Sequence, residues 1–285
     1  MPQPTIRAAI RKSSGYTLVE LIVVIILLGI VGLFTFNYVG FGTRIYIDTT
    51  GREQLVSQSR FAVERLSREL RNAVPRSIRV NELDAQRCIE FIPIITSSNY
   101  LQIPRPGPTS NADFIAVEPI RAAEAAGNSL YVYATNQNFL YGNSELRRKT
   151  IDVVSFDTPE PGLVVFEYSA SPSFFPTDSP ARRYYVGGSP VSWCYNEVAN
   201  RLERYRNYGL LATQLSHSQL LAAASYEIMA VDLVNDLTAP DELPFRVFEA
   251  TLQRNNLVEI DWRFRRGSSN ESLQLLHEVH APNVP

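Results

Sequence analysis

The chain has 285 residues, of which 45% are hydrophobic and 20% are charged, and its 27 basic side chains nearly balance its 29 acidic ones. This composition excludes a disordered chain, a collagen-like repeat and a strongly polybasic protein. The hydrophobic residues are unevenly spread, because 18 of the 24 residues from Tyr16 to Val39 are apolar. The sequence therefore indicates one segment that is apolar enough to lie in a membrane, followed by a folded domain of average composition.

The apolar segment is long enough for a transmembrane helix. Leu21–Phe36 is apolar apart from two glycines and one threonine, and with its flanks it reaches the ~30 Å of a bilayer core at ~1.5 Å per residue. Residues 1–15 carry Arg7, Arg11 and Lys12 and no acid. Because basic flanks stay in the cytoplasm, we expect a single pass through the inner membrane with the rest of the chain in the periplasm of a bacterium. No small-residue A-x-A site follows the run, so we expect no ordinary signal-peptide removal.

A specific motif stands where the apolar segment begins. The sequence Gly15-Tyr16-Thr17-Leu18-Val19-Glu20 places a glycine at the end of a basic leader, an aromatic residue directly after it, and a glutamate four positions further on. In these features the chain resembles the type IV prepilins and the type II secretion pseudopilins. The resemblance implies that a prepilin peptidase, which is also the methyltransferase, cuts between Gly15 and Tyr16 and methylates the new amino group of Tyr16. It further implies that Glu20 pairs with the N-terminal amine of an adjacent subunit.

Glu20 also stands out on physical grounds. A lone carboxylate inside an apolar helix costs roughly 2.5–3.5 kcal/mol on insertion scales and is normally retained for a partner. The alternative is a plain membrane anchor whose Glu20 lies near the headgroups by chance. Cutting after Gly15 removes three basic residues and leaves 24 basic and 29 acidic ones, a net charge of about −5. We therefore expect no nucleic-acid partner.

From Tyr46 the pattern becomes that of an amphipathic helix. Apolar residues recur every three or four positions with charged residues between them: Leu55, Ala62, Leu66, Leu70 and Ala73. Pro75 disfavours continuation, so we expect a helix from Tyr16 to about Val74, with a break possible at Gly40-Phe41-Gly42. We predict four parts: a prepilin leader peptide (1–15), a transmembrane and assembly helix (16–40), an amphipathic helix half (41–75) and a globular head (76–285).

The head is predicted to be rich in β-strands. Beyond Pro75, clusters of Pro, Gly, Ser and Asn separate short β-type runs, of which Cys88–Ile95 is one. Tyr208–Glu227 is a helix candidate because of its Leu and Ala content. The expected fold is α+β, in which a long N-terminal helix packs on a mostly antiparallel β-rich head, as the resemblance to pilins also implies.

The clearest hairpin lies near the end of the chain. It joins Arg246–Leu252 to Leu257–Phe264 through Asn255-Asn256, two residues that tolerate positive φ. The turn Gly267-Ser-Ser-Asn270 then leads into a last strand, Leu273–His280. We therefore expect a three-stranded meander.

The two cysteines, Cys88 and Cys194, suit one disulfide in an extracytoplasmic domain. If paired, they close a loop of roughly 105 residues, for which the chain-entropy model gives a stabilisation of ~4.7 kcal/mol. The alternative is two free buried thiols.

Further segments resemble one branch of the superfamily. The block Ser59–Pro75 resembles the large minor pilins of the PilW and pseudopilin J types. Within that group, four segments resemble minor pilins of the mannose-sensitive haemagglutinin (MSHA) pilus: Tyr46–Asp48, Arg87–Pro93, Pro190–Tyr195 and His277–Pro285. The resemblance implies a low-abundance subunit that primes pilus assembly or lies at the filament tip, where it would serve surface attachment and cell adhesion. Its partners would be other minor and major pilins and the inner-membrane assembly platform.

We find no catalytic constellation in the sequence. The run His277-Glu-Val-His280 is one residue short of the zinc-protease H-E-x-x-H, and on a strand its two histidines would point to opposite faces. The acidic group Asp232, Asp236, Asp241 and Glu242 lacks the spacing of a calcium loop, so a solvated loop is the preferred interpretation. We expect no metal, no cofactor and no enzyme activity.

Two groups of residues that contain aromatic side chains could form either a binding surface or part of the fold. Arg201, Arg204 and Arg206 with Tyr205 and Tyr208 form either a nucleic-acid stripe or, given Glu203 between them, an exposed strand face. Phe139–Tyr141 and Tyr184-Tyr185 either line a surface for a glycan or pack in the core. Three hypotheses follow: an MSHA-type minor pilin, a J-like minor pseudopilin of a type II secretion system, and an adhesive tip lectin.

Overall fold

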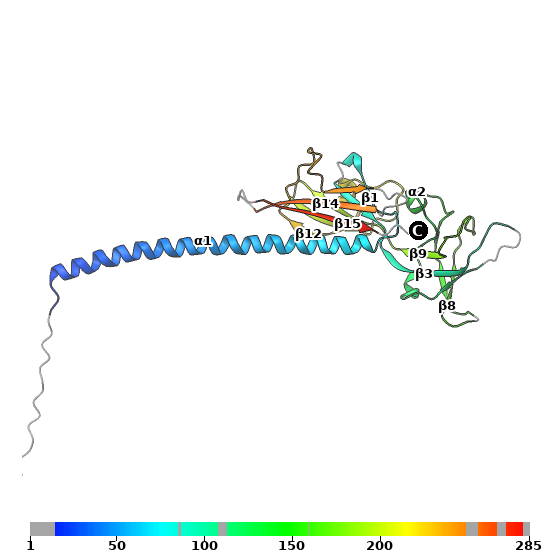
Figure 1. Ribbon diagram of the computed structural model, residues 1–285, viewed down its shortest axis with the longest axis horizontal. Helices are drawn as coiled ribbons and strands as arrows, with labels where there is room; N and C mark the ends of the chain where they lie inside the picture. The colour runs from blue at the N-terminus through cyan, green and yellow to red at the C-terminus, as the bar shows by residue number, and fades with distance from the viewer. Residues whose placement is uncertain are drawn as a thin grey trace, which may run out of the picture. The chain divides into compact units, whose positions relative to one another are not determined.

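A computed structural model describes residues 15–84, 87–107, 113–158, 160–248, 256–266 and 272–281. Contacts between Cα atoms divide the chain into two units, Met1–Glu53 and Gln54–Pro285. The helix α1 (Leu18–Arg71), which begins blue and ends cyan in Figure 1, contributes to both units. The fold is α+β, as predicted: a long N-terminal helix and a mostly antiparallel β-rich head.

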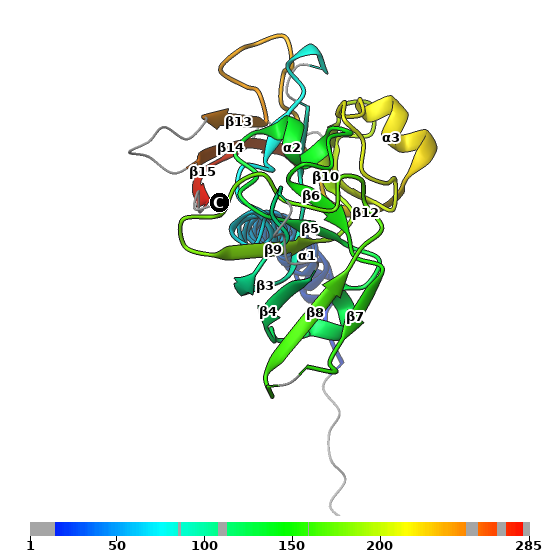
Figure 2. The same cartoon turned by 90° about the vertical axis from the view of Figure 1, so that its right-hand side faces the viewer.

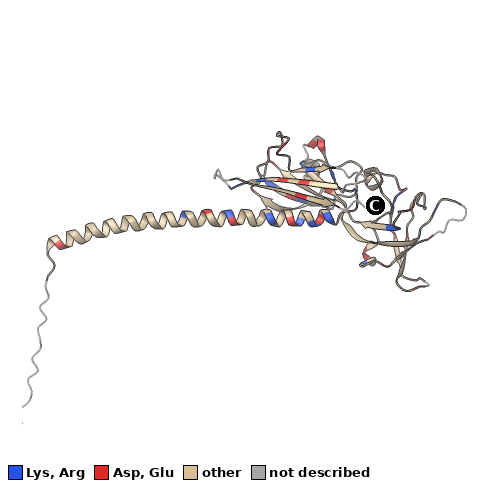
Figure 3. Ribbon diagram, in the orientation of Figure 1, with Lys and Arg blue, Asp and Glu red and all other residues tan. Residues whose placement is uncertain are grey.

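In the first unit, α1 is an apolar helix without a break. It continues through Gly40 and Gly42, where a break was possible. Within the described residues, one helix is long and apolar enough to cross a membrane, and it is α1; a signal sequence near an N-terminus would have the same properties. Charged residues are almost absent from the first half of α1 and frequent in its second half (Figure 3).

In the second unit, the rest of α1 packs into the main core. The apolar positions predicted to share one face, Leu55, Ala62, Leu66, Leu70 and Ala73, are all buried. They contact apolar side chains from two sheets, among them Trp193 and Trp262. The helix ends at Arg71, four residues before Pro75, close to the predicted end.

A five-stranded antiparallel sheet covers one side of this part of α1. Its strand order is β1-β2-β10-β11-β12. The strands are β1 (Arg79–Val80), β2 (Cys88–Phe91), β10 (Val191–Asn196), β11 (Arg201–Arg206) and β12 (Ser225–Val231). The short helix α3 (His217–Ala223) directly precedes β12, and Leu220 of α3 packs with Tyr205 of β11.

A three-stranded antiparallel sheet contributes to the same core. It consists of β13 (Phe245–Phe248), β14 (Asn256–Arg265) and β15 (Ser272–Ala281), in that order. The predicted meander at the end of the chain is therefore confirmed. Of the residues in its two predicted turns, Asn256 is described, whereas Asn255 and Gly267–Asn270 lie outside the described residues. In Figure 2 these three strands are separated from α3.

A seven-stranded antiparallel sheet has its own core. Its order is β6-β5-β9-β3-β4-β8-β7. The strands are β6 (Arg148–Thr150), β5 (Ser129–Tyr131), β9 (Arg183–Gly187), β3 (Ile94–Gln102), β4 (Phe114–Val117), β8 (Leu163–Glu167) and β7 (Val153–Ser155). Its aromatic core centres on Phe114, whose ring contacts those of Tyr100, Phe166, Phe175 and Tyr184. The 3-10 helices Glu82–Asp84 and Ala122–Ala125 and the helix α2 (Gln137–Tyr141) complete the described elements.

Two expectations about the head were wrong. The predicted strand Cys88–Ile95 is divided between β2 and β3, which belong to different sheets. Pro93 lies at the division, and proline cannot donate to a continuous ladder. The helix predicted over Tyr208–Glu227 is limited to α3, because Ser225–Val231 forms the edge strand β12, paired with β11.

Candidate assembly site

The first turn of α1 contains a reciprocal cap. The hydroxyl oxygen of Thr17 accepts a hydrogen bond from the backbone N–H of Glu20 at 3.3 Å, and the Glu20 carboxylate accepts one from the N–H of Thr17 at 3.4 Å. This is the capping-box arrangement, in which a threonine and a glutamate three residues later satisfy each other's free N–H groups. The cap fixes the start of the helix and places the Glu20 carboxylate beside the end of the chain that would carry the new amine.

The residues around the expected cleavage site are exposed. Tyr16 is 89% exposed and precedes the helix. A Cβ added at Gly15 would meet no atom within 4 Å. Packing against the described residues therefore does not require glycine at position 15.

The apolar side chains of the first unit are also exposed. From Leu18 to Ile47, every large hydrophobic side chain is at least 45% exposed. An apolar surface on all sides of a helix is stable only when lipid or other apolar helices cover it. Glu20 is the single charged residue between Leu18 and Thr43. Among the described residues, its carboxylate accepts one hydrogen bond, from the backbone N–H of Thr17, which leaves acceptor capacity for an ammonium group.

The two cysteines form the disulfide Cys88–Cys194. They lie directly opposite each other on β2 and β10, and both are fully buried. Tyr205 and Leu220 pack over them. The disulfide therefore joins two neighbouring strands of the five-stranded sheet beneath α3.

Charged contacts attach α1 to the five-stranded sheet. The Glu69 carboxylate accepts hydrogen bonds from Trp193 Nε1 at 2.9 Å and from Arg204 Nε at 3.0 Å. Arg65 pairs with Glu69 within the helix and with Glu227 of β12 at 3.7 Å. These contacts fix the rotation of the second half of α1 against the head.

The arginines considered as a nucleic-acid stripe are engaged in ion pairs. Arg201 pairs with Glu203, Arg204 with Glu69 and Glu227, and Arg206 with Glu227 at 2.7 Å. Their positive charge is balanced within the head, which does not favour a nucleic-acid stripe. The expected exposed strand face was also wrong, because Glu203 and Tyr205 are fully buried and Arg206 is the one exposed residue of β11.

The other candidate groups are dispersed. His277 and His280 lie on opposite faces of β15, as predicted for a strand. In the acidic group, Asp236 accepts hydrogen bonds from Thr238, and Glu242 pairs with Arg263. Among the described residues, His, Cys, Asp and Glu form no cluster of three that could hold a metal. Tyr141 and Tyr184 are core residues, and Phe139 and Tyr185 are partly buried.

Sequence reasoning missed three buried carboxylates, Glu203, Glu90 and Asp261, and the first two of them lie in networks of hydrogen bonds. Glu203 accepts hydrogen bonds from Asn196, Arg201 and Tyr205 and contacts His217 Nε2 at 3.0 Å. Burial alone would raise the pKa of Glu203, but hydrogen bonds from His217, Tyr205, Asn196 and Arg201 outweigh it and lower the pKa to about 2.

Glu90, the second of these carboxylates, accepts hydrogen bonds from Arg79 Nε at 2.5 Å and from Tyr208 at 3.0 Å. Arg79 also donates to the carbonyls of Leu211 and Ala212, and its guanidinium lies 3.5 Å from the centre of the Tyr141 ring. Glu90 and Glu203 together hold the segment 205–217 on the sheet. Their role is therefore structural.

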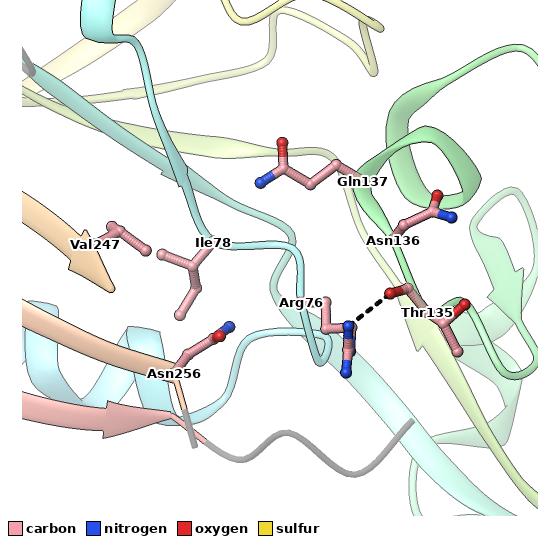
Figure 4. Close-up of a pocket in the computed structure, with 7 residues that line it drawn as sticks. All are labelled: Arg76, Ile78, Thr135, Asn136, Gln137, Val247 and Asn256. Atoms are coloured by element: carbon pink, nitrogen blue, oxygen red, sulfur yellow. Dashed lines mark hydrogen bonds between the residues drawn. The ribbon is translucent and has the colours of Figure 1, made fainter. Parts of the chain in front are cut away.

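A small pocket lies between the sheets of the head (Figure 4). Its volume is about 110 Å³, and Arg76 Nη1 donates to the Thr135 carbonyl at its edge, 2.8 Å away. Arg76 has a φ of 66°, in the left-handed region. The remaining lining residues, Ile78, Asn136, Gln137, Val247 and Asn256, include no acid, base or nucleophile. The lining residues that the structure describes therefore offer hydrogen bonding.

A family model described as the prokaryotic N-terminal methylation motif matches residues 10–36. No curated protein and no solved structure matches the chain. The matched segment includes Gly15, Tyr16 and Glu20, and it implies processing by a prepilin peptidase and assembly with other pilins. The motif and the apolar helix fit membrane anchoring before assembly. The motif supports placing this chain in the type IV pilin and pseudopilin superfamily, as a pilin-like protein of a pilus or a pseudopilus.

Proposed function

We propose that this protein is a minor pilin of an MSHA-type pilus, of the kind represented by the pilus protein MshO, and that it acts in the initiation of pilus assembly or in the filament tip complex. Its role is assembly and surface attachment without catalysis. The observation that carries the proposal is the methylation motif, in which a single carboxylate begins an exposed apolar helix. The resemblance of Arg87–Pro93, Pro190–Tyr195 and the chain's end, His277–Pro285, to MSHA minor pilins supports the finer assignment.

The proposed route begins with cleavage between Gly15 and Tyr16 and methylation of the Tyr16 amine. The apolar half of α1 then holds the protein in the inner membrane, with the head in the periplasm. During assembly, Glu20 exchanges the N–H of its own first turn for the amine of a neighbouring subunit. The exposure of Tyr16 and Glu20 supports this exchange, because both residues are accessible to a neighbouring subunit.

The experiment is a comparison of Glu20→Ala with wild type in cells that assemble the filament. We expect Glu20→Ala to remain in the membrane fraction while its amount in sheared filaments falls about tenfold or more, since a charge-assisted contact contributes ~1.5–3 kcal/mol. Glu53→Ala is the matched control, because Glu53 is an exposed acid of α1 beyond the apolar segment. Normal incorporation of Glu20→Ala would contradict the role given to Glu20.

The methylation motif fits a J-like minor pseudopilin of a type II secretion system equally well. Deletion of the gene separates the two assignments. Loss of pili and of surface attachment with normal protein secretion is the result expected for a minor pilin. Loss of protein secretion with normal pili would instead establish the pseudopilin role.

A further inference from the structure

Within the head, the charged side chains are paired on one flank of α1 and unpaired among the described residues on the other. On the flank that faces β11 and β12, Arg65 and Glu69 are paired with Glu227 and Arg204. On the other flank, Arg68 and Arg71 are exposed, and in the part of the chain that the structure describes neither side chain forms an ion pair or a hydrogen bond. Two cations of α1 are therefore available to a ligand on this second flank.

These cations line a groove between α1 and the edge strand β15. The α1–β15 groove has a volume of about 620 Å³ and is bounded by α1 from Val63 to Arg71, by Asn72 directly after the helix, and by His277 of β15. Figure 1 shows β15, in red, running alongside this part of α1. A volume of this size is in the usual range of ligand sites, ~300–1,000 Å³.

A buried hydroxyl in the groove has no partner among the described residues. Ser67 lines the groove and is only 5% exposed, and its Oγ forms no hydrogen bond with any residue that the structure describes. Leaving such a group unsatisfied costs ~1–3 kcal/mol, so a ligand that accepts its hydrogen bond gains affinity. The hydroxyl, the two guanidinium groups and the amide of Asn72 are all donors suited to a carboxylate.

The neighbouring strand indicates the form of the ligand. β15 is the last strand of its sheet, and among the described residues it pairs along its ten positions with β14 alone. The second edge of a terminal strand presents backbone N–H and C=O groups to an extended chain. An extended peptide with carboxylates at alternate positions can direct them to one side, where Arg68 and Arg71 lie.

We propose that the α1–β15 groove binds an extended acidic segment of another polypeptide. Arg68 and Arg71 bind its carboxylates, and Ser67 donates to one of them. Glu64, which also lines the groove, repels a carboxylate placed one turn nearer the start of the helix and so restricts the register. The proposal is independent of the filament to which the protein belongs.

The test uses the full-length protein in detergent micelles and two fluorescein-labelled octapeptides, one alternating Thr and Glu and one alternating Thr and Gln. We expect the acidic peptide to bind about tenfold more tightly, and the difference to disappear in the double variant Arg68→Gln/Arg71→Gln. Arg60→Gln is the matched control, because Arg60 is an exposed arginine of α1 outside the groove. Equal binding of the two peptides, or an equal loss in Arg60→Gln, would overturn the proposal.

Two further measurements test whether Ser67 acts in binding or in folding, and whether the groove binds a peptide or a small anion. Ser67→Ala removes an unsatisfied hydroxyl, so we expect an unchanged or raised unfolding midpoint together with several-fold weaker binding of the acidic peptide. A lowered midpoint with unchanged binding would assign Ser67 a structural role and contradict the proposal. Free glutamate or inorganic phosphate should not displace the peptide at concentrations near the peptide's Kd; displacement there would make the groove a small-anion site.

Discussion

Thr17 and Glu20 cap the start of α1 reciprocally, each accepting a hydrogen bond from the other's backbone N–H. In the single chain the Glu20 carboxylate therefore contributes to the helix end. In an assembled filament we expect the same carboxylate to bind the amine of a neighbour. Helix capping and the proposed subunit contact would thus use the same carboxylate, and the two uses can be tested separately.

The capping role predicts the effect of Thr17→Val. Loss of an N-cap side chain costs ~1 kcal/mol, so the amides of the first turn of α1 should exchange with solvent about fivefold faster in micelles. Thr35→Val is the control, because the Thr35 hydroxyl donates to the Val31 carbonyl inside the helix and caps nothing. Equal exchange in wild type and Thr17→Val would show that the cap is not formed.

Packing of the second half of α1 predicts a contrast between two of its residues. Leu66 is fully buried, whereas Phe61 is 55% exposed. Leu66→Ala should lower the free energy of unfolding of the head by ~2–5 kcal/mol through the cavity it leaves. Phe61→Ala should change it by less than about 0.5 kcal/mol. Urea unfolding followed by tryptophan fluorescence reports both, and similar losses would mean that α1 does not pack as described.

The disulfide predicts a redox-dependent stability. Cys88 and Cys194 are separated by 106 positions and fully buried. Removing a disulfide from a small exported domain typically costs ~2–5 kcal/mol. Cys88→Ser/Cys194→Ser should show this loss under oxidising conditions and no further loss with reductant. A reductant effect in the double variant equal to that in wild type would indicate that the effect does not come from this bond.

Glu203 predicts a particular acid sensitivity. Its folded-state pKa of about 2 lies below the ordinary value of 4.5, so the ionised carboxylate stabilises the fold fully above pH 4.5. This contribution, on the order of 3 kcal/mol, is lost as the pH falls from 4.5 towards 2. Glu203→Gln should lose a similar amount at pH 7 and show a flatter dependence in that window. An unchanged pH profile in the variant would contradict the network around Glu203.

Features set by neighbouring residues could be predicted from the sequence. The end of α1 near Pro75 and the burial of Leu66 and Leu70 follow from local signals and a helical period. The final meander follows from alternation and turn residues. The cleavage and assembly residues Gly15, Tyr16 and Glu20 were predicted from one contiguous motif, and their roles remain predictions.

Features set by distant residues could not be predicted. Glu90 is buried because Arg79 and Tyr208 neutralise and bind it, and Tyr208 lies 118 positions away. Likewise, no sequence pattern places Ser67 of α1 beside His277 of β15. The division of Cys88–Ile95 at Pro93 shows that the same β-type run can supply two sheets.

Mass spectrometry of the N-terminus of the protein isolated from its own cells tests the central claim most directly. The account predicts a chain that begins at Tyr16 and carries one methyl group on its amine. A chain that retains Met1 and the basic leader in assembled filaments would contradict processing at Gly15 and, with it, membership of a prepilin-type assembly route.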